Sequence, residues 1–175
     1  MKSARFVEVS RAGPSAVVAV LITLGLAIFL AAAPRPFGPV AEPWLHACVI
    51  YFWTHRRPSM MPPLLCFGAG LLADLITGGP IGLWALSLTG LSLAARVTRP
   101  MADSQPWPKR LGYFALSLVF MILVASIALG AAGVSGGAPL PGMALHALTT
   151  LIIYIPLESL LAFIAGRVGL RRGAL

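Results

Sequence analysis

Charge is what this sequence has least of. Lysine and arginine together number thirteen, aspartate and glutamate only five, and all four make up 10% of the 175 residues. A soluble domain carries about a quarter charged residues, so this chain cannot build a water-exposed polar shell. Its hydrophobic residues reach 58% and its mean hydropathy is +0.90. The scarcity of charge therefore excludes an ordinary soluble domain and indicates a protein whose solvent is lipid.

Cysteine is also scarce, and catalytic patterns are missing. Cys48 and Cys66 lie in apolar runs with no cysteine or histidine at metal-ligand spacing. We therefore expect two buried or lipid-facing thiols, no disulfide framework and no metal site. The serines are scattered along apolar runs, where a hydroxyl usually bonds its own backbone, and no phosphate loop or nucleotide fingerprint occurs. We expect no enzymatic activity and no cofactor.

What the sequence does contain is a series of six apolar segments. The first, residues 14–33, has twenty residues without a charge, and a helix of that length spans the roughly 30 Å of bilayer hydrocarbon. We predict an all-α polytopic membrane protein in which residues 1–175 form one integral membrane domain. The six predicted spans are residues 14–33, 44–54, 60–77, 81–95, 111–132 and 143–168.

Two of these segments have a second interpretation. Residues 14–33 follow a basic start and end in three alanines, as a cleaved secretory signal does. The run is long for a signal core, and Pro34 would follow the cut directly, so we predict that it is retained. Residues 44–54 are short enough to be re-entrant or interfacial. Trp44 at one end and the aromatic residues 51–53 at the other suit two membrane interfaces, which favours a crossing.

The basic residues follow the positive-inside rule. If all six segments cross, twelve of the thirteen lysines and arginines fall on one side and only Arg35 on the other. We therefore predict that both termini are cytoplasmic. The net charge of +8 is explained by this topology, so we expect lipid contact and no nucleic-acid binding. Residues 96–110 are predicted to form a polar cytoplasmic loop along the headgroups, a topology signal that could also bind anionic lipid; its basic residues are Arg96, Arg99, Lys109 and Arg110.

A helical hairpin over residues 60–83, MMPPLLCFGAGLLADLITGGPIGL, carries the most informative pattern. Asp74 is an acid in an apolar run, which is costly in hydrocarbon unless it is paired, hydrated or neutralised. It follows Gly70 by four residues and so shares a helix face with small residues that allow close packing. Two interpretations stay open: a local structural anchor beside the turn, or a contact with a partner or substrate. The candidate hairpin residues are Gly68, Gly70, Asp74, Gly78, Pro80 and Gly82.

Two further polar residues lie in the last segment. Glu158 is midway along it, and Pro156 leaves a backbone carbonyl without its helical donor one turn earlier. A structural hydrogen bond, or pairing with His146 or an arginine, is expected for Glu158 rather than a coupling-ion site. His146 lies nearer the outer surface and is interpreted as an interfacial histidine.

Residues 44–100 resemble the bacterial rod shape-determining protein MreD family. The resemblance rests on FGAGLLADL at residues 67–75 and GGPIGLWAL at residues 78–86, and it covers about a third of the chain. It implies a non-enzymatic inner-membrane scaffold of the cell-elongation complex that maintains rod shape. The implied partners are an MreC-like membrane protein and, through it, MreB-like filaments, a RodA-type glycosyltransferase and a class B penicillin-binding transpeptidase.

The resemblance also carries a fold and an alternative function. The MreD family is similar to the six-helix S components of energy-coupling vitamin transporters, so the same fold is expected here. The competing hypothesis is a small-molecule carrier subunit, in which Asp74, His146 and Glu158 line one ligand cavity. Under the scaffold hypothesis, the hairpin packs against a partner helix and the basic loops face cytosolic proteins.

Overall fold

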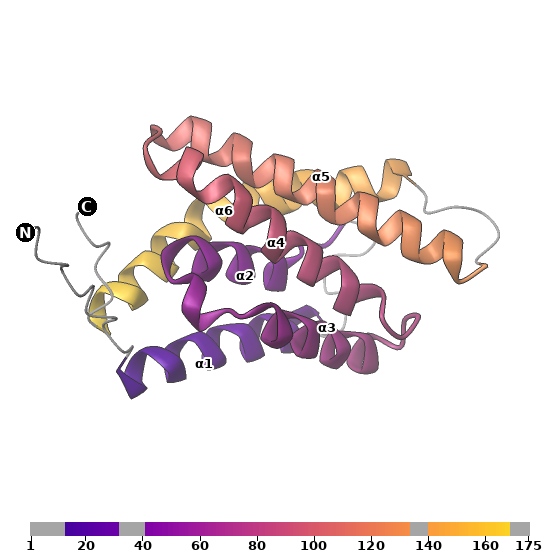
Figure 1. Cartoon of the computed structure of the whole chain (residues 1–175), viewed down its shortest axis with the longest axis horizontal. Coiled ribbons are helices and arrows are strands. Elements are labelled where there is room, and N and C mark those ends of the chain that lie inside the picture. Colours follow the sequence, from indigo (N-terminus) through magenta and orange to yellow (C-terminus); the bar gives the residue numbers. More distant parts are fainter. Residues whose placement is uncertain (1–12, 32–40, 134–139, 169–175) are drawn as a thin grey trace, which may run out of the picture.

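The protein is all-helical in the part that the structure describes. The computed structural model describes residues 13–31, 41–133 and 140–168. Within them lie six α-helices and one short 3-10 helix, and no strand occurs among these residues (Figure 1). The elements are α1 (Pro14–Ala31), α2 (Leu45–Arg56), η1 (Pro58–Met60), α3 (Pro63–Thr77), α4 (Leu83–Asp103), α5 (Trp107–Ala131) and α6 (Leu140–Arg167). Each of the six predicted apolar segments therefore contains one α-helix, and the all-α prediction is confirmed.

Three of the helices are long and apolar enough to cross a membrane. These are α1, α5 and the part of α6 from Gly142 to Arg167, while α3 is apolar but shorter. Large hydrophobic side chains on the three helices are exposed, for example Phe29, Ile127 and Phe163. Because exposed side chains of this size are costly in water and favourable in lipid, the helices and the composition together indicate a membrane protein.

Helix α2 lies at the centre of the fold. Its residues 46–54 are all buried, and it contacts α1, α4 and α6 on its different sides (Figure 1). The Trp53 indole donates a hydrogen bond of 3.0 Å to the Thr23 hydroxyl of α1. The interpretation of residues 51–53 as interfacial aromatics is wrong, because these rings pack inside the protein. The buried stretch is mostly apolar, with His46 and Thr54 as its polar members.

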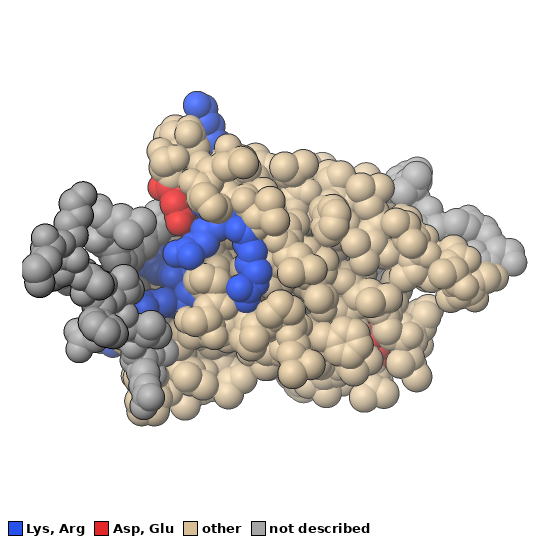
Figure 2. Space-filling view, in the orientation of Figure 1, with Lys and Arg blue, Asp and Glu red and all other residues tan. Residues whose placement is uncertain are grey.

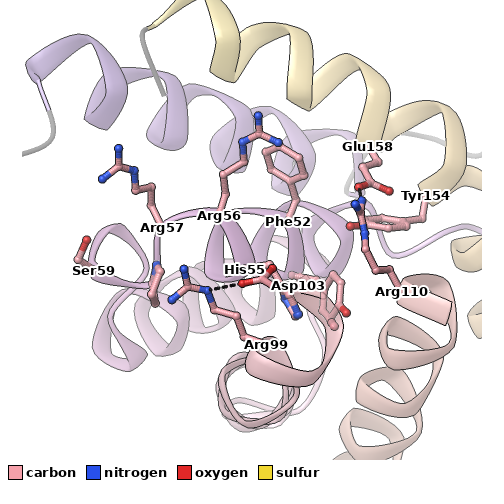
Figure 3. Close-up of a pocket in the computed structure, with 13 residues that line it drawn as sticks. Phe52, His55, Arg56, Arg57, Ser59, Arg99, Asp103, Arg110, Tyr154 and Glu158 are labelled. Carbon is pink, nitrogen blue, oxygen red and sulfur yellow. Dashed lines mark hydrogen bonds and ion pairs between the residues drawn. The ribbon is translucent and has the colours of Figure 1, made fainter. Parts of the chain in front are cut away.

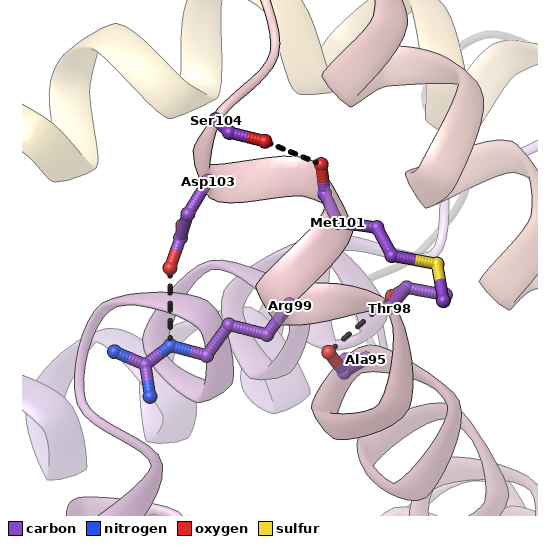
Figure 4. Close-up of polar contacts among 6 residues, drawn as sticks. All are labelled: Ala95, Thr98, Arg99, Met101, Asp103 and Ser104. Carbon is purple, nitrogen blue, oxygen red and sulfur yellow. Dashed lines mark hydrogen bonds and ion pairs between the residues drawn. The ribbon is translucent and has the colours of Figure 1, made fainter.

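Helix α4 is longer than the sequence indicated. The prediction of a polar loop over residues 96–110 is wrong, because α4 continues to Asp103 and α5 begins at Trp107. Polar side chains support the last turns of α4: Arg99 and Asp103 form an (i, i+4) ion pair at 3.4 Å, and the Ser104 hydroxyl bonds the Met101 carbonyl (Figure 4). Such pairs stabilise helix turns outside the hydrocarbon. The basic residues are thus held on two helices.

Candidate functional site

Asp74 caps the helix that follows its own. It lies on α3 with only 1% of its surface exposed. Its carboxylate accepts hydrogen bonds from the backbone N–H groups of Gly82 and Trp84, both at 2.8 Å, and of Ala85 at 3.4 Å. These donors lie at the start of α4, where N–H groups lack intrahelical partners and the helix dipole favours an anion. Of the two interpretations left open, the structure shows the local anchor.

The glycines of the hairpin have two different surroundings. A side-chain carbon at Gly70 would lie 2.4 Å from the Ala85 Cα, so the close approach of α3 and α4 requires glycine there. Gly78 and Gly82 have φ angles of +68° and +97°, which glycine adopts without strain. A side-chain carbon at Gly68 would meet no atom within 4 Å. The predicted small-residue face is therefore split: Gly70 packs inside the chain, and Gly68 faces outward.

The turn between the two helices is completed by backbone bonds. The Gly78 N–H bonds the Asp74 carbonyl at 3.0 Å, which ends α3, and the Leu83 N–H bonds the Pro80 carbonyl at 3.1 Å. The hairpin motif singled out in the sequence is thus a closed unit in which the acid, the glycines and the proline fix one turn.

His146 and Glu158 lie on the same helix but do not meet. The His146 Nδ1 atom is 2.7 Å from the Glu42 carbonyl oxygen, and its ring stacks on Trp44 at a centroid distance of 5.7 Å. Glu158 forms an ion pair with Arg110 of α5. Pairing of Glu158 with an arginine was one of the expected outcomes, and it fixes α6 against α5.

The three groups of the carrier hypothesis are separated in the described structure. Glu158 lines a basic cavity, and His146 lines a smaller apolar cavity of about 260 Å³ that also includes Trp44 and Trp84. Asp74 lines neither of these cavities, because its carboxylate faces the backbone of α4. Neither of these two cavities brings all three groups together.

The four basic residues predicted on one loop have separate surroundings. Arg96 donates hydrogen bonds to the carbonyl oxygens of Pro58, at 2.8 Å, and Met61, so it holds the connection between α2 and α3. Arg99 pairs with Asp103 and Arg110 with Glu158, while Lys109 is exposed. Arg96 is therefore a structural clamp, and Arg99 and Arg110 line a cavity together with their acidic partners.

The basic cavity has a volume of about 490 Å³ and lies where the ends of α2 and α4 and the start of α5 meet the middle of α6. Lysine and arginine side chains gather at this end of the molecule, whereas the rest of the visible face is almost free of charge (Figure 2). Figure 3 shows the arginines and the two acids around the cavity. Its lining residues are Tyr51, Phe52, His55, Arg56, Arg57, Pro58, Ser59, Arg99, Ala102, Asp103, Arg110, Tyr154 and Glu158.

The electrostatics of the basic cavity favour an anion. Four guanidinium groups and two carboxylates line it, so positive charge is in excess. His55, which follows the predicted second span, adds no charge because burial lowers its pKa to about 4. The Tyr51 hydroxyl is buried without a hydrogen-bond partner among the described residues. Buried polar groups of this kind usually have a partner.

Sequence reasoning missed this cavity. Arg56 and Arg57 served only as a topology signal, and residues 96–110 were interpreted as a loop. The available signal was weak: Asp103 lies among basic residues, and Glu158 was expected to pair with an arginine. Their convergence with the arginines depends on the packing of α2, α4, α5 and α6.

The two cysteines and the possible metal ligands are the remaining reactive residues. Cys48 and Cys66 are free and buried, as predicted. Among residues 13–31, 41–133 and 140–168, no group of three histidine, cysteine, aspartate or glutamate side chains is placed to hold a metal ion.

No protein-family model, curated protein or solved structure matches the chain. Because these comparisons identify no family, the resemblance of residues 44–100 to MreD proteins enters below only as a proposal.

Proposed function

We propose that this protein is a non-enzymatic scaffold of the MreD type in a bacterial inner membrane, with six spans and both termini in the cytoplasm. The proposal is supported by the residues that carry the resemblance, since they form one structural unit. Helix α2 lies at the centre, and the hairpin of α3 and α4 is closed by Asp74 and Gly70. This use of the motif fits a structural role better than a catalytic one.

The observation that carries the proposal is the outer face of α3. Gly70 and Asp74 face inward, and the opposite side exposes Gly68 together with Leu64 and Leu75, which are 80% and 69% exposed. Within a bilayer, helices associate through small residues that let two backbones approach, because lipid matches apolar side chains but not close packing. We place the transmembrane helix of an MreC-like partner on this face, with Gly68 at the contact.

The charged end of the protein is the proposed contact surface for cytoplasmic partners. Under the positive-inside rule this end faces the cytoplasm, where MreB-like filaments lie. The RodA-type glycosyltransferase and the class B penicillin-binding transpeptidase would be reached through the MreC-like partner. The six-span topology makes a separate prediction: a reporter fused at residue 104 reads as cytoplasmic and one at residue 79 as periplasmic. A periplasmic signal at residue 104 would contradict the topology.

Affinity capture from native membranes tests the docking face. The variant Gly68→Leu fills the outer face of α3 and is expected to reduce recovery of the MreC-like partner at least about tenfold, as loss of about 1.4 kcal/mol would do. Gly25→Leu is the matched control, because Gly25 is also exposed, on α1, with no atom within 4 Å of an added carbon. Equal recovery from both variants would refute the docking face. Failure of the wild-type protein to recover any elongation protein would refute the proposed function.

A further inference from the structure

We propose that the basic cavity binds a phosphate group at the cytoplasmic membrane interface. The site goes beyond the scaffold role and does not depend on it. The shared chemistry is an ionised phosphate, carried either by the headgroup of an anionic phospholipid or by a soluble molecule.

Three arginines from different parts of the chain line the cavity. Arg57 directly follows α2, and Arg99 and Arg110 lie on α4 and α5 (Figure 3). Guanidinium groups bind phosphate oxygens through paired hydrogen bonds and are the usual side chains for this purpose. No carboxylate of the described residues pairs with Arg57. The pair of Arg99 with Asp103 is long, at 3.4 Å, and both side chains are over one-third exposed, so an added anion can compete for Arg99.

The cavity lining also includes a hydroxyl group that donates no hydrogen bond to the described residues. The Tyr51 side chain is only 3% exposed and lines the cavity, yet its hydroxyl has no hydrogen-bond partner among the described residues. Leaving such a group unpaired is unfavourable. A phosphate oxygen would accept this hydrogen bond once a small shift of the lining exposes the hydroxyl, which has almost no accessible surface. The arginines thus attract an anion, and the hydroxyl requires an acceptor that the described protein does not supply.

The cavity also has a suitable size and position for a phosphate-bearing ligand. The cavity volume of about 490 Å³ lies within the roughly 300–1,000 Å³ of typical ligand cavities. It opens at the charged end of the helices, where a bilayer places its headgroups, and basic pockets between helices on this side of a membrane bind lipid headgroups. Phe52 and Tyr154 add aromatic surface to the lining.

The test uses the full chain, delipidated and reconstituted in nanodiscs. One arm titrates phosphatidylglycerol into phosphatidylcholine discs and counts retained lipid by native mass spectrometry. A second arm adds inorganic phosphate to pure phosphatidylcholine discs and follows the thermal midpoint. Retention of phosphatidylglycerol without an effect of millimolar phosphate identifies a lipid headgroup as the source, and the reverse identifies a soluble phosphate. No retention and no shift in either arm would overturn the proposal.

Two double variants distinguish binding in the cavity from general attraction of phosphate to a basic surface. Arg57→Gln with Arg99→Gln is expected to weaken phosphate binding at least about tenfold, since each charge-assisted hydrogen bond lost typically weakens binding by that order. The matched control is Lys109→Gln with Arg167→Gln, which removes two exposed positive charges that do not line the cavity. An equal loss in both double variants would overturn the proposal.

A second variant keeps the test valid if the double variant misfolds. Tyr51→Phe removes only the unpartnered hydroxyl, so the fold is retained or slightly stabilised, which circular dichroism in the same discs checks. We expect about fivefold to tenfold weaker phosphate binding, the effect of one lost hydrogen bond. Unchanged affinity in Tyr51→Phe would show that the hydroxyl does not face the bound group and would overturn this assignment.

Discussion

The side chain of Asp74 should contribute more to the free energy of unfolding than any other single polar side chain on the hairpin. It joins α3 to the first turn of α4 through two hydrogen bonds of 2.8 Å and a longer one of 3.4 Å. The variant Asp74→Ala leaves the N–H groups of Gly82 and Trp84 without these acceptors. Hydrogen bonds to a charged acceptor contribute about 1.5–3 kcal/mol each. Removal of the carboxylate also relieves the cost of burying a charge, so we expect a net loss of about 2–5 kcal/mol.

The conservative variant Asp74→Asn separates the geometry from the charge. An asparagine amide presents one acceptor oxygen and one donor nitrogen, so it can keep one of the two short bonds and turns a donor toward the other N–H group. We expect it to lower the free energy of unfolding by about 1–3 kcal/mol, less than alanine does. Any loss of partner binding in this variant would then follow from a loosened hairpin.

The free energy of unfolding can be measured by adding dodecyl sulfate to mixed micelles while far-ultraviolet circular dichroism follows helix content. Asp103→Asn is the matched control, because this side chain is 42% exposed and its ion pair with Arg99 lies at the surface. Exposed pairs contribute about 0–1 kcal/mol, so the control should stay close to wild type. Unfolding of Asp74→Asn at the wild-type free energy would refute the capping role.

Three other predictions follow from the same structure and use the same unfolding measurement. Gly70→Ala should cost at least about 2 kcal/mol, because its new carbon would meet α4 backbone at 2.4 Å, whereas Gly68→Ala should be neutral or slightly stabilising in open space. Arg110→Gln and Glu158→Gln should each lower the free energy of unfolding more than the double variant does, with a coupling energy of about 1–3 kcal/mol, because the two paired side chains are only 21% and 14% exposed. Additive effects of the two substitutions would contradict a paired role. Arg96→Gln should lower the free energy of unfolding by about 1.5–3 kcal/mol, because two carbonyl oxygens in the connection after α2 lose their charged donor. A change below about 0.5 kcal/mol would show that Arg96 does not hold this connection.

The helices were the most predictable part of the molecule. Apolar runs bounded by prolines, glycines and charges indicated six helices, and the segment predicted over residues 111–132 overlaps α5 almost completely. The end of α4 was misjudged because its last turns carry charged side chains. A hydropathy pattern reports where hydrocarbon ends, but the helix itself continues through Pro100 into the polar zone. Pro100 removes one backbone donor without ending the helix.

The candidate site was only partly predictable. The sequence indicated that Asp74 and Gly70 share a helix face, because residues four apart do so on any helix. It left open whether that face meets another protein or the same chain. In the sequence, Gly68 and Gly70 look alike, since both are glycines in the same apolar run. Their environments are opposite because only Gly70 packs against the Ala85 backbone, which the sequence does not show.

What the sequence by itself determined is the solvent and the local structure: too few charges for water, six apolar helices, and a glycine-rich hairpin with one acid. These properties depend on composition and on neighbours along the chain. The tertiary structure alone decided that Asp74 caps α4, that α2 is enclosed on every side, and that arginines from three helices surround one cavity. The physical reason is that burial and charge pairing depend on which surfaces meet, and groups such as Arg110 and Glu158 are 48 residues apart until the helices pack.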